Sequence, residues 1–121
     1  MKRILIVEDN PDNLDMLTRR LERKDFEVVS ATDGKSGLEM AQTKSPDLIL
    51  LDIDLPEMDG WEVSRFLKKD ERTREIPVIA LTAFALEGDR EKALEVGCDG
   101  YASKPIGFRD LLEKMATFLP H

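Results

Sequence analysis

The chain has 121 residues, of which 41% are hydrophobic and 36% are charged, a size and composition that predict one globular domain over residues 1–121. Its formal net charge of −7 argues against intrinsic binding to nucleic acid or to a membrane surface, because both need a basic patch. No segment approaches the roughly 20 apolar residues of a membrane span, and none has the pattern of a signal peptide. With a single Cys98, which we expect to be a small buried residue, the sequence predicts a cytoplasmic protein.

Short apolar runs alternate along the chain with longer amphipathic segments. The predicted strands are residues 3–7, 27–31, 48–51, 78–81 and 100–102. The first, third and fourth runs are apolar at consecutive positions, as in strands that are covered on both faces. Helical spacing follows each run; Phe108, Leu111, Leu112, Met115 and Phe118 form the clearest apolar stripe.

Local signals mark where the helices begin and end. Asn10 precedes a proline, and Asp33 and Asp59 precede the second and third helical segments, as capping residues do. Gly97 closes the fourth helical segment. Strict alternation of strands and helices predicts an α/β, doubly wound fold with a parallel sheet between two helical layers.

Ligands of such folds bind beyond the carboxyl ends of the strands, so the residues that follow each run are the candidates for chemistry. Polar side chains stand at four of these ends. They are Glu8 and Asp9 after the first run, Asp52 and Asp54 after the third, Thr82 after the fourth and Lys104 after the fifth. The topology therefore predicts that carboxylates, a hydroxyl and an ammonium meet at one edge of the sheet.

This combination suits phosphoryl chemistry. Glu8, Asp9 and Asp52 offer the oxygen ligands that Mg²⁺ prefers, and a carboxylate can act as a nucleophile toward phosphorus. Lys104 and Thr82 could bind phosphoryl oxygens. Each residue alone has an ordinary alternative as a cap, a turn residue or a solvated loop acid. Their placement at the ends of different strands is what favours an acyl-phosphate site with Mg²⁺ as cofactor.

Four stretches, ILIVEDN, LILLDIDLPEMDGWE, IALTAFA and GYASKPI, resemble the receiver domains of two-component response regulators. The resemblance covers essentially the whole chain and is strongest toward single-domain regulators of the DivK type. It implies a flavodoxin-like (βα)5 sandwich with strand order 2-1-3-4-5. It also implies a phosphorelay switch whose chemistry is limited to its own phosphorylation and dephosphorylation, not an enzyme with an external substrate.

The resemblance further implies a role for each acidic residue. Asp52 would be the phosphoacceptor and Asp9 a direct Mg²⁺ ligand. Glu8 would orient the metal largely through water, and the backbone carbonyl of Asp54 would complete the protein ligands. Gly60 would stand where a Cβ would crowd the phosphorylation loop.

For the remaining positions, the resemblance implies that Lys104 holds the phosphoryl group and that the bond before Pro105 is cis. Thr82 would swing inward on phosphorylation, and Tyr101 would follow by changing rotamer. We also interpret Phe84 as a partial shield of the phosphoryl group against water.

The expected partners are a sensor histidine kinase or histidine phosphotransfer protein and a downstream protein target. Contact with the target is expected through residues 86–119, in a monomer or weak dimer without nucleic acid or membrane. The start at Met1 and the end just past the last predicted helix favour a complete single-domain protein, with a receiver cut from a larger regulator as the alternative.

Two alternatives come from other functional classes. The first is a Mg²⁺-dependent phosphohydrolase with an Asp nucleophile, since Asp52 and Asp54 resemble the paired aspartates of haloacid-dehalogenase-like enzymes. Those enzymes carry the motif after their first strand and need a longer chain. The second is a flavodoxin-like cofactor binder, although acids in the segment EDNPDN would repel a flavin phosphate.

Overall fold

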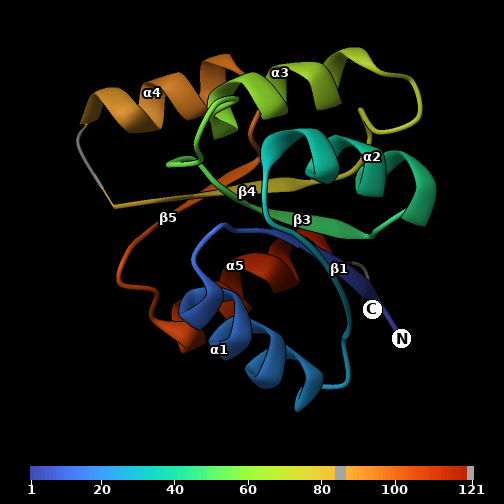
Figure 1. Ribbon diagram of the computed structural model, residues 1–121. Helices are drawn as coiled ribbons and strands as arrows, with labels where there is room; N and C mark the ends of the chain where they lie inside the picture. Colours follow the sequence, from blue (N-terminus) through green and yellow to red (C-terminus); the bar gives the residue numbers. More distant parts are fainter. Residues whose placement is uncertain (84–86, 120–121) are drawn as a thin grey trace.

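Five parallel strands lie between two layers of helices in the computed structural model, which describes residues 1–83 and 87–119 (Figure 1). The strands are β1 (Arg3–Val7), β2 (Glu27–Ala31), β3 (Leu48–Asp52), β4 (Val78–Thr82) and β5 (Gly100–Ser103). The helices are α1 (Pro11–Glu22), α2 (Gly34–Lys44), α3 (Gly60–Lys69), α4 (Glu87–Glu95) and α5 (Phe108–Phe118). The sheet order is β2-β1-β3-β4-β5, which confirms the predicted doubly wound α/β fold.

The strand boundaries follow the predicted runs closely, with one systematic difference. β1 and β2 have the predicted ends, whereas β3, β4 and β5 each extend by one polar residue: Asp52, Thr82 and Ser103. The ladder continues through these residues, because Asp52 pairs with Leu81 and the Ile53 N–H donates to the Leu81 carbonyl at 2.9 Å. Two of the candidate site residues therefore belong to the sheet itself.

Side-chain caps open the first three helices as the sequence predicted. The Asn10 side chain accepts two backbone N–H groups of α1, both at 3.0 Å. Asp33 and Asp59 each accept one from the first turns of α2 and α3, at 2.8 and 3.0 Å. Gly97 follows α4 with a φ of +88°, a conformation that glycine adopts readily.

The core has two apolar layers, one on each face of the sheet. α2, α3 and α4 cover one face, and α1 and α5 cover the other (Figure 1). Side chains alternate between these layers along each strand: Leu5 and Val7 belong to the first, and Ile4 and Ile6 to the second. Every residue of β3 is buried, so this central strand is a firm support for Asp52 at its end. None of the described helices is long and apolar enough to cross a membrane.

α3 and α4 meet through specific polar and aromatic contacts. Trp61, at the start of α3, is buried, and the Lys92 Nζ of α4 lies 5.5 Å from its ring centroid. The Ser64 hydroxyl donates to the Val96 carbonyl at 3.0 Å. Cys98 is buried, as predicted, and burial raises the pKa of its thiol, which lies beside the Ser64 hydroxyl.

Candidate phosphorylation site

Three carboxylates converge at the carboxyl edge of the sheet. Glu8 and Asp9 directly follow β1, and Asp52 ends the neighbouring strand β3, where Val7 pairs with Leu51. Carboxylate oxygens of the three residues lie within 4.8 Å of one another. Glu8 and Asp52 are each only 1% exposed, whereas Asp9 is open to solvent. The structure thus brings together the acidic group that the topology predicted.

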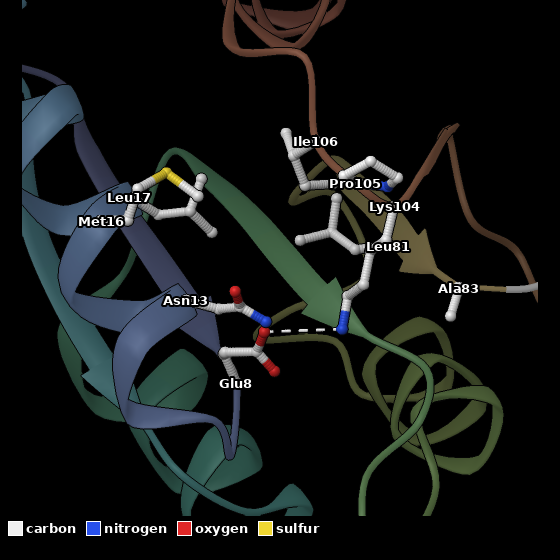
Figure 2. A pocket seen from close by; sticks show the side chains of 9 residues that line it. All are labelled: Glu8, Asn13, Met16, Leu17, Leu81, Ala83, Lys104, Pro105 and Ile106. Carbon is white, nitrogen blue, oxygen red and sulfur yellow. Dashed lines mark ion pairs between the residues drawn. The ribbon is translucent and has the colours of Figure 1, made fainter.

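Lys104 supplies the positive charge of the site. It follows β5, and its backbone N–H donates to the Thr82 carbonyl at 2.7 Å. Its Nζ lies 3.0 Å from Asp52 Oδ2 and 3.5 Å from Glu8 Oε1; Figure 2 shows the ion pair with Glu8. The bond between Lys104 and Pro105 is cis, as the resemblance implied.

The surroundings shift the pKa values of the two buried acids, Asp52 and Glu8, in opposite directions. Burial acts to raise the pKa of Asp52, but the adjoining Glu8 carboxyl, the Asp54 N–H and Lys104 together lower it. Burial, and then the neighbouring Asp52 carboxylate, raise the pKa of Glu8 to about 7. For Lys104, burial opposes the charged form, but Asp52 and Glu8 outweigh it and raise the pKa of the ammonium. Asp52 is therefore ionised at neutral pH. Glu8, whose pKa is about 7, is partly protonated there in the absence of a metal ion.

The donor set fits a hard divalent cation. Both carboxylate oxygens of Glu8 are buried, and among the described residues the one nearby cation, Lys104, lies 3.5 Å from Oε1 without forming a hydrogen bond to it. Buried acceptors without donors are costly unless a cation or ordered water satisfies them. With Asp9 and Asp52 beside them, they form the carboxylate-rich group that Mg²⁺ uses.

The loop after β3 is fixed against Asp52. The Asp54 N–H donates to Asp52 Oδ1 at 2.9 Å, and the exposed Asp54 carboxylate accepts the Ala83 N–H at 3.3 Å. A Cβ on Gly60 would lie 2.5 Å from the Asp52 carbonyl oxygen and 2.6 Å from Ile53 Cα. This close approach agrees with the expectation that a Cβ at position 60 would crowd the loop.

Thr82 and Tyr101 lie on the same face of the sheet. Thr82 ends β4 and is 1% exposed, and Tyr101 pairs with Ala80, two residues earlier on that strand. The half-buried Tyr101 ring packs against the apolar layer under α2, α3 and α4. Thr82 and Tyr101 therefore lie on neighbouring strands and on the same face of the sheet, so a displacement of the end of β4 would reach the surroundings of Tyr101. Phe84, also singled out in the sequence, lies outside the described residues.

One feature was missed in the sequence: a cavity of about 430 Å³ beside Glu8 and Lys104. It opens between α1 and the segment after β5, and Figure 2 shows the Asn13 side chain pointing toward Glu8. Its lining residues are Glu8, Asn13, Met16, Leu17, Leu81, Ala83, Lys104, Pro105 and Ile106. Helical spacing of residues 13, 16 and 17 was the available signal, because this spacing puts them on one face of α1.

Comparison with known proteins places these features in context. Residues 4–116 match a family model described as the response regulator receiver domain. The polar-differentiation response regulator DivK of Brucella ovis is 43% identical over 118 residues, which cover 98% of this chain and 96% of that protein. The corresponding protein of Brucella anthropi is 42% identical over the same share of both chains.

Solved structures give the same assignment. Chemotaxis protein CheY4 of Vibrio cholerae superposes with a TM-score of 0.93 at 27% identity, covering 98% of this chain and 99% of that one. The receiver domain of the sensor histidine kinase PA1611 of Pseudomonas aeruginosa has a TM-score of 0.89 at 36% identity, covering 97% and 96%. That structure has a magnesium ion coordinated in its active site cleft.

Proposed function

Since the chain belongs to the response regulator receiver family and is a phosphorylation-dependent switch of two-component signalling, we propose that Asp52 accepts the phosphoryl group. The observation that carries this proposal is that the buried Asp52 carboxylate lies 3.0 Å from Lys104 Nζ. The cation and the Asp54 N–H favour the ionised carboxylate, the form that attacks phosphorus. Asp52 is therefore the proposed nucleophile.

Glu8, Asp9 and Asp52 would hold Mg²⁺ at this site, together with the backbone carbonyl of Asp54. The two buried oxygens of Glu8 without hydrogen-bond donors support this assignment. The Asp54 carboxylate is directed at the Ala83 N–H, which favours a role for its backbone rather than its side chain. When bound, Mg²⁺ supplies charge neutralisation and polarises the phosphoryl oxygens.

The transfer step itself needs few protein groups. An Asp52 oxygen forms a bond to phosphorus while the bond from phosphorus to the donor's leaving atom breaks, and the leaving group departs with that electron pair. In this proposal the Lys104 ammonium, 3.0 Å from Asp52 Oδ2, would bind one phosphoryl oxygen, and the Thr82 hydroxyl would donate a hydrogen bond to another. Water later cleaves the acyl phosphate, which regenerates the Asp52 carboxylate and releases inorganic phosphate.

The stored phosphoryl group is the signal in this proposal. Contact of Thr82 with it would draw the end of β4 inward and change the packing of Tyr101. The output surface is proposed to be α4, β5 and α5, where a cavity of about 390 Å³ includes Tyr101 in its lining. A histidine kinase or histidine phosphotransfer protein would donate the phosphoryl group to this single receiver domain. A downstream protein would then recognise the output surface of a monomer or weak dimer.

Labelling with acetyl phosphate tests the acceptor. With Mg²⁺, mass spectrometry of the wild-type protein is expected to detect one added phosphoryl group, which Asp52→Asn loses. Asp47→Asn is the matched control, because Asp47 lies at the opposite edge of the sheet, where it accepts the Arg3 N–H. Stoichiometric labelling of Asp52→Asn would refute the assignment. Sustained turnover of a generic phosphate ester, abolished in Asp54→Asn, would favour a phosphohydrolase instead.

A further inference from the structure

We infer that the Asp54 carboxylate restrains the switch, because it holds the Ala83 N–H in the unphosphorylated protein and this contact opposes phosphorylation of Asp52. The inference deepens the proposed function and rests on Asp52 as acceptor. It assigns the side chain of Asp54 a task separate from the metal ligand proposed for its backbone.

Two hydrogen bonds define the arrangement. The Asp54 N–H donates to Asp52 Oδ1 at 2.9 Å, so the backbone of Asp54 is tied to the acceptor. Its carboxylate then reaches from the loop after β3 to the first residue after β4, where Oδ2 accepts the Ala83 N–H at 3.3 Å. Ala83 directly follows the buried Thr82. One residue, Asp54, thus connects the acceptor, through its backbone N–H, to the residue next to the proposed switch hydroxyl, through its carboxylate.

The charges around Asp52 make this contact sensitive to phosphorylation. A phosphoryl group adds a charge of about −1.5 to −2 at neutral pH and three strong acceptor oxygens. The Lys104 ammonium pairs with Asp52 Oδ2, whereas the Asp54 N–H donates to Asp52 Oδ1. Lys104 and Asp54 therefore contact different oxygens of the acceptor carboxylate. The new group would therefore repel the Asp54 carboxylate and compete with it for nearby N–H donors.

Reciprocity gives the direction of the effect. If phosphorylation weakens the contact between Asp54 and Ala83, then the contact disfavours the phosphorylated state by the same factor. A solvent-exposed hydrogen bond of this length is modest, and its loss corresponds to about a two- to tenfold change in an equilibrium constant. The restraint is strong enough to tune the switch and weak enough for one phosphoryl group to overcome.

Amide exchange in the unphosphorylated protein tests the contact itself. Asp54→Asn and Asp54→Ala carry the same charge, but only Asn keeps an acceptor oxygen. We expect the Ala83 amide to exchange about two- to tenfold faster in Asp54→Ala than in Asp54→Asn, measured by NMR. Glu57→Asn, which removes one charge from the same loop, is expected to leave that amide unchanged. Equal exchange in the two Asp54 variants would overturn the inference.

Binding of beryllofluoride, a phosphoryl mimic, tests the coupling at saturating Mg²⁺. The expected order of affinity is Asp54→Ala tightest, Asp54→Asn next and wild type weakest, with two- to tenfold between the two variants. Tightest binding by the wild type, or equal binding by the two variants, would overturn the inference alone. Wild-type-like binding by Asp52→Asn would instead overturn the proposed acceptor, and the inference with it.

Discussion

Replacement of Gly60 by alanine tests how tightly the phosphorylation loop is built. The added Cβ would meet the Asp52 carbonyl oxygen at 2.5 Å and Ile53 Cα at 2.6 Å, and both are backbone atoms that cannot turn aside. Overpacking of this kind costs about 1–3 kcal/mol. The higher helix propensity of alanine offsets at most about 1 kcal/mol. Because Gly60 is the first residue of α3, this offset is small, and we expect Gly60→Ala to lower the free energy of unfolding by roughly 1–3 kcal/mol.

Urea denaturation followed by circular dichroism measures this change, provided that the slope of the transition stays constant. Gly107→Ala is the matched control, since its Cβ would lie 3.5 Å from Asp110 Oδ2, an ordinary contact. At this N-cap of α5, alanine caps the helix slightly less well than glycine, which destabilises the fold. Alanine also lowers the entropy of the unfolded chain, which stabilises the fold, and the two effects should nearly cancel. Because the displaced atoms belong to the acceptor and the next residue, Gly60→Ala should also accept phosphate more slowly than the control. Wild-type stability in Gly60→Ala would refute the packing argument.

Three further predictions concern charge and capping. In the absence of metal, Lys104→Met leaves the buried Asp52 carboxylate facing Glu8 with no cation beside it. We expect the free energy of unfolding in urea to fall by about 1–3 kcal/mol, less than for a fully buried ion pair because the Lys104 side chain is 20% exposed. An unchanged urea midpoint would contradict this prediction. Because the pKa of Glu8 is raised from 4.5 to about 7, the folded state holds a proton that the unfolded chain has released, so metal-free stability should fall as pH rises between these values. Glu8→Gln should flatten this slope, and a slope that persists in the variant would exclude Glu8 as its source. Asn10→Ala removes the acceptor of two N–H groups of α1 and should cost about 1 kcal/mol of unfolding free energy, whereas a variant as stable as wild type would show that solvent caps this helix equally well.

The fold was almost fully predictable from the sequence because its signals are local. Runs of β-branched and apolar residues, each followed by a cap and a helical stripe, leave few alternatives to a doubly wound sheet. The strand ends were predicted one residue short at Asp52, Thr82 and Ser103 because a polar side chain ends the apolar pattern. Backbone pairing does not depend on that polarity, so the ladder continues through these residues.

The sequence was sufficient to predict which residues form the acidic group, but not how deeply they are buried or how their pKa values shift. Parallel strands bring their carboxyl ends together, and this topology alone places Glu8, Asp9 and Asp52 at one edge of the sheet. The 1% exposure of Glu8 and its raised pKa depend on tertiary burial and on the distance to the Asp52 carboxylate, neither of which a strand-end pattern specifies. The contact between Asp54 and Ala83 joins residues 29 positions apart and left no pattern in the sequence.

The packing of α4 on α3 also equips the protein with an intrinsic optical probe. Trp61 is the only tryptophan of the chain, and the charged end of Lys92 lies 5.5 Å from its ring centroid. The emission of an indole responds to a nearby charge, so a displacement of α4 relative to α3 would shift the fluorescence without any attached label. Stopped-flow recordings could then time the response of this helix pair to a phosphodonor, and Lys92→Met would give the trace expected when the charge is absent.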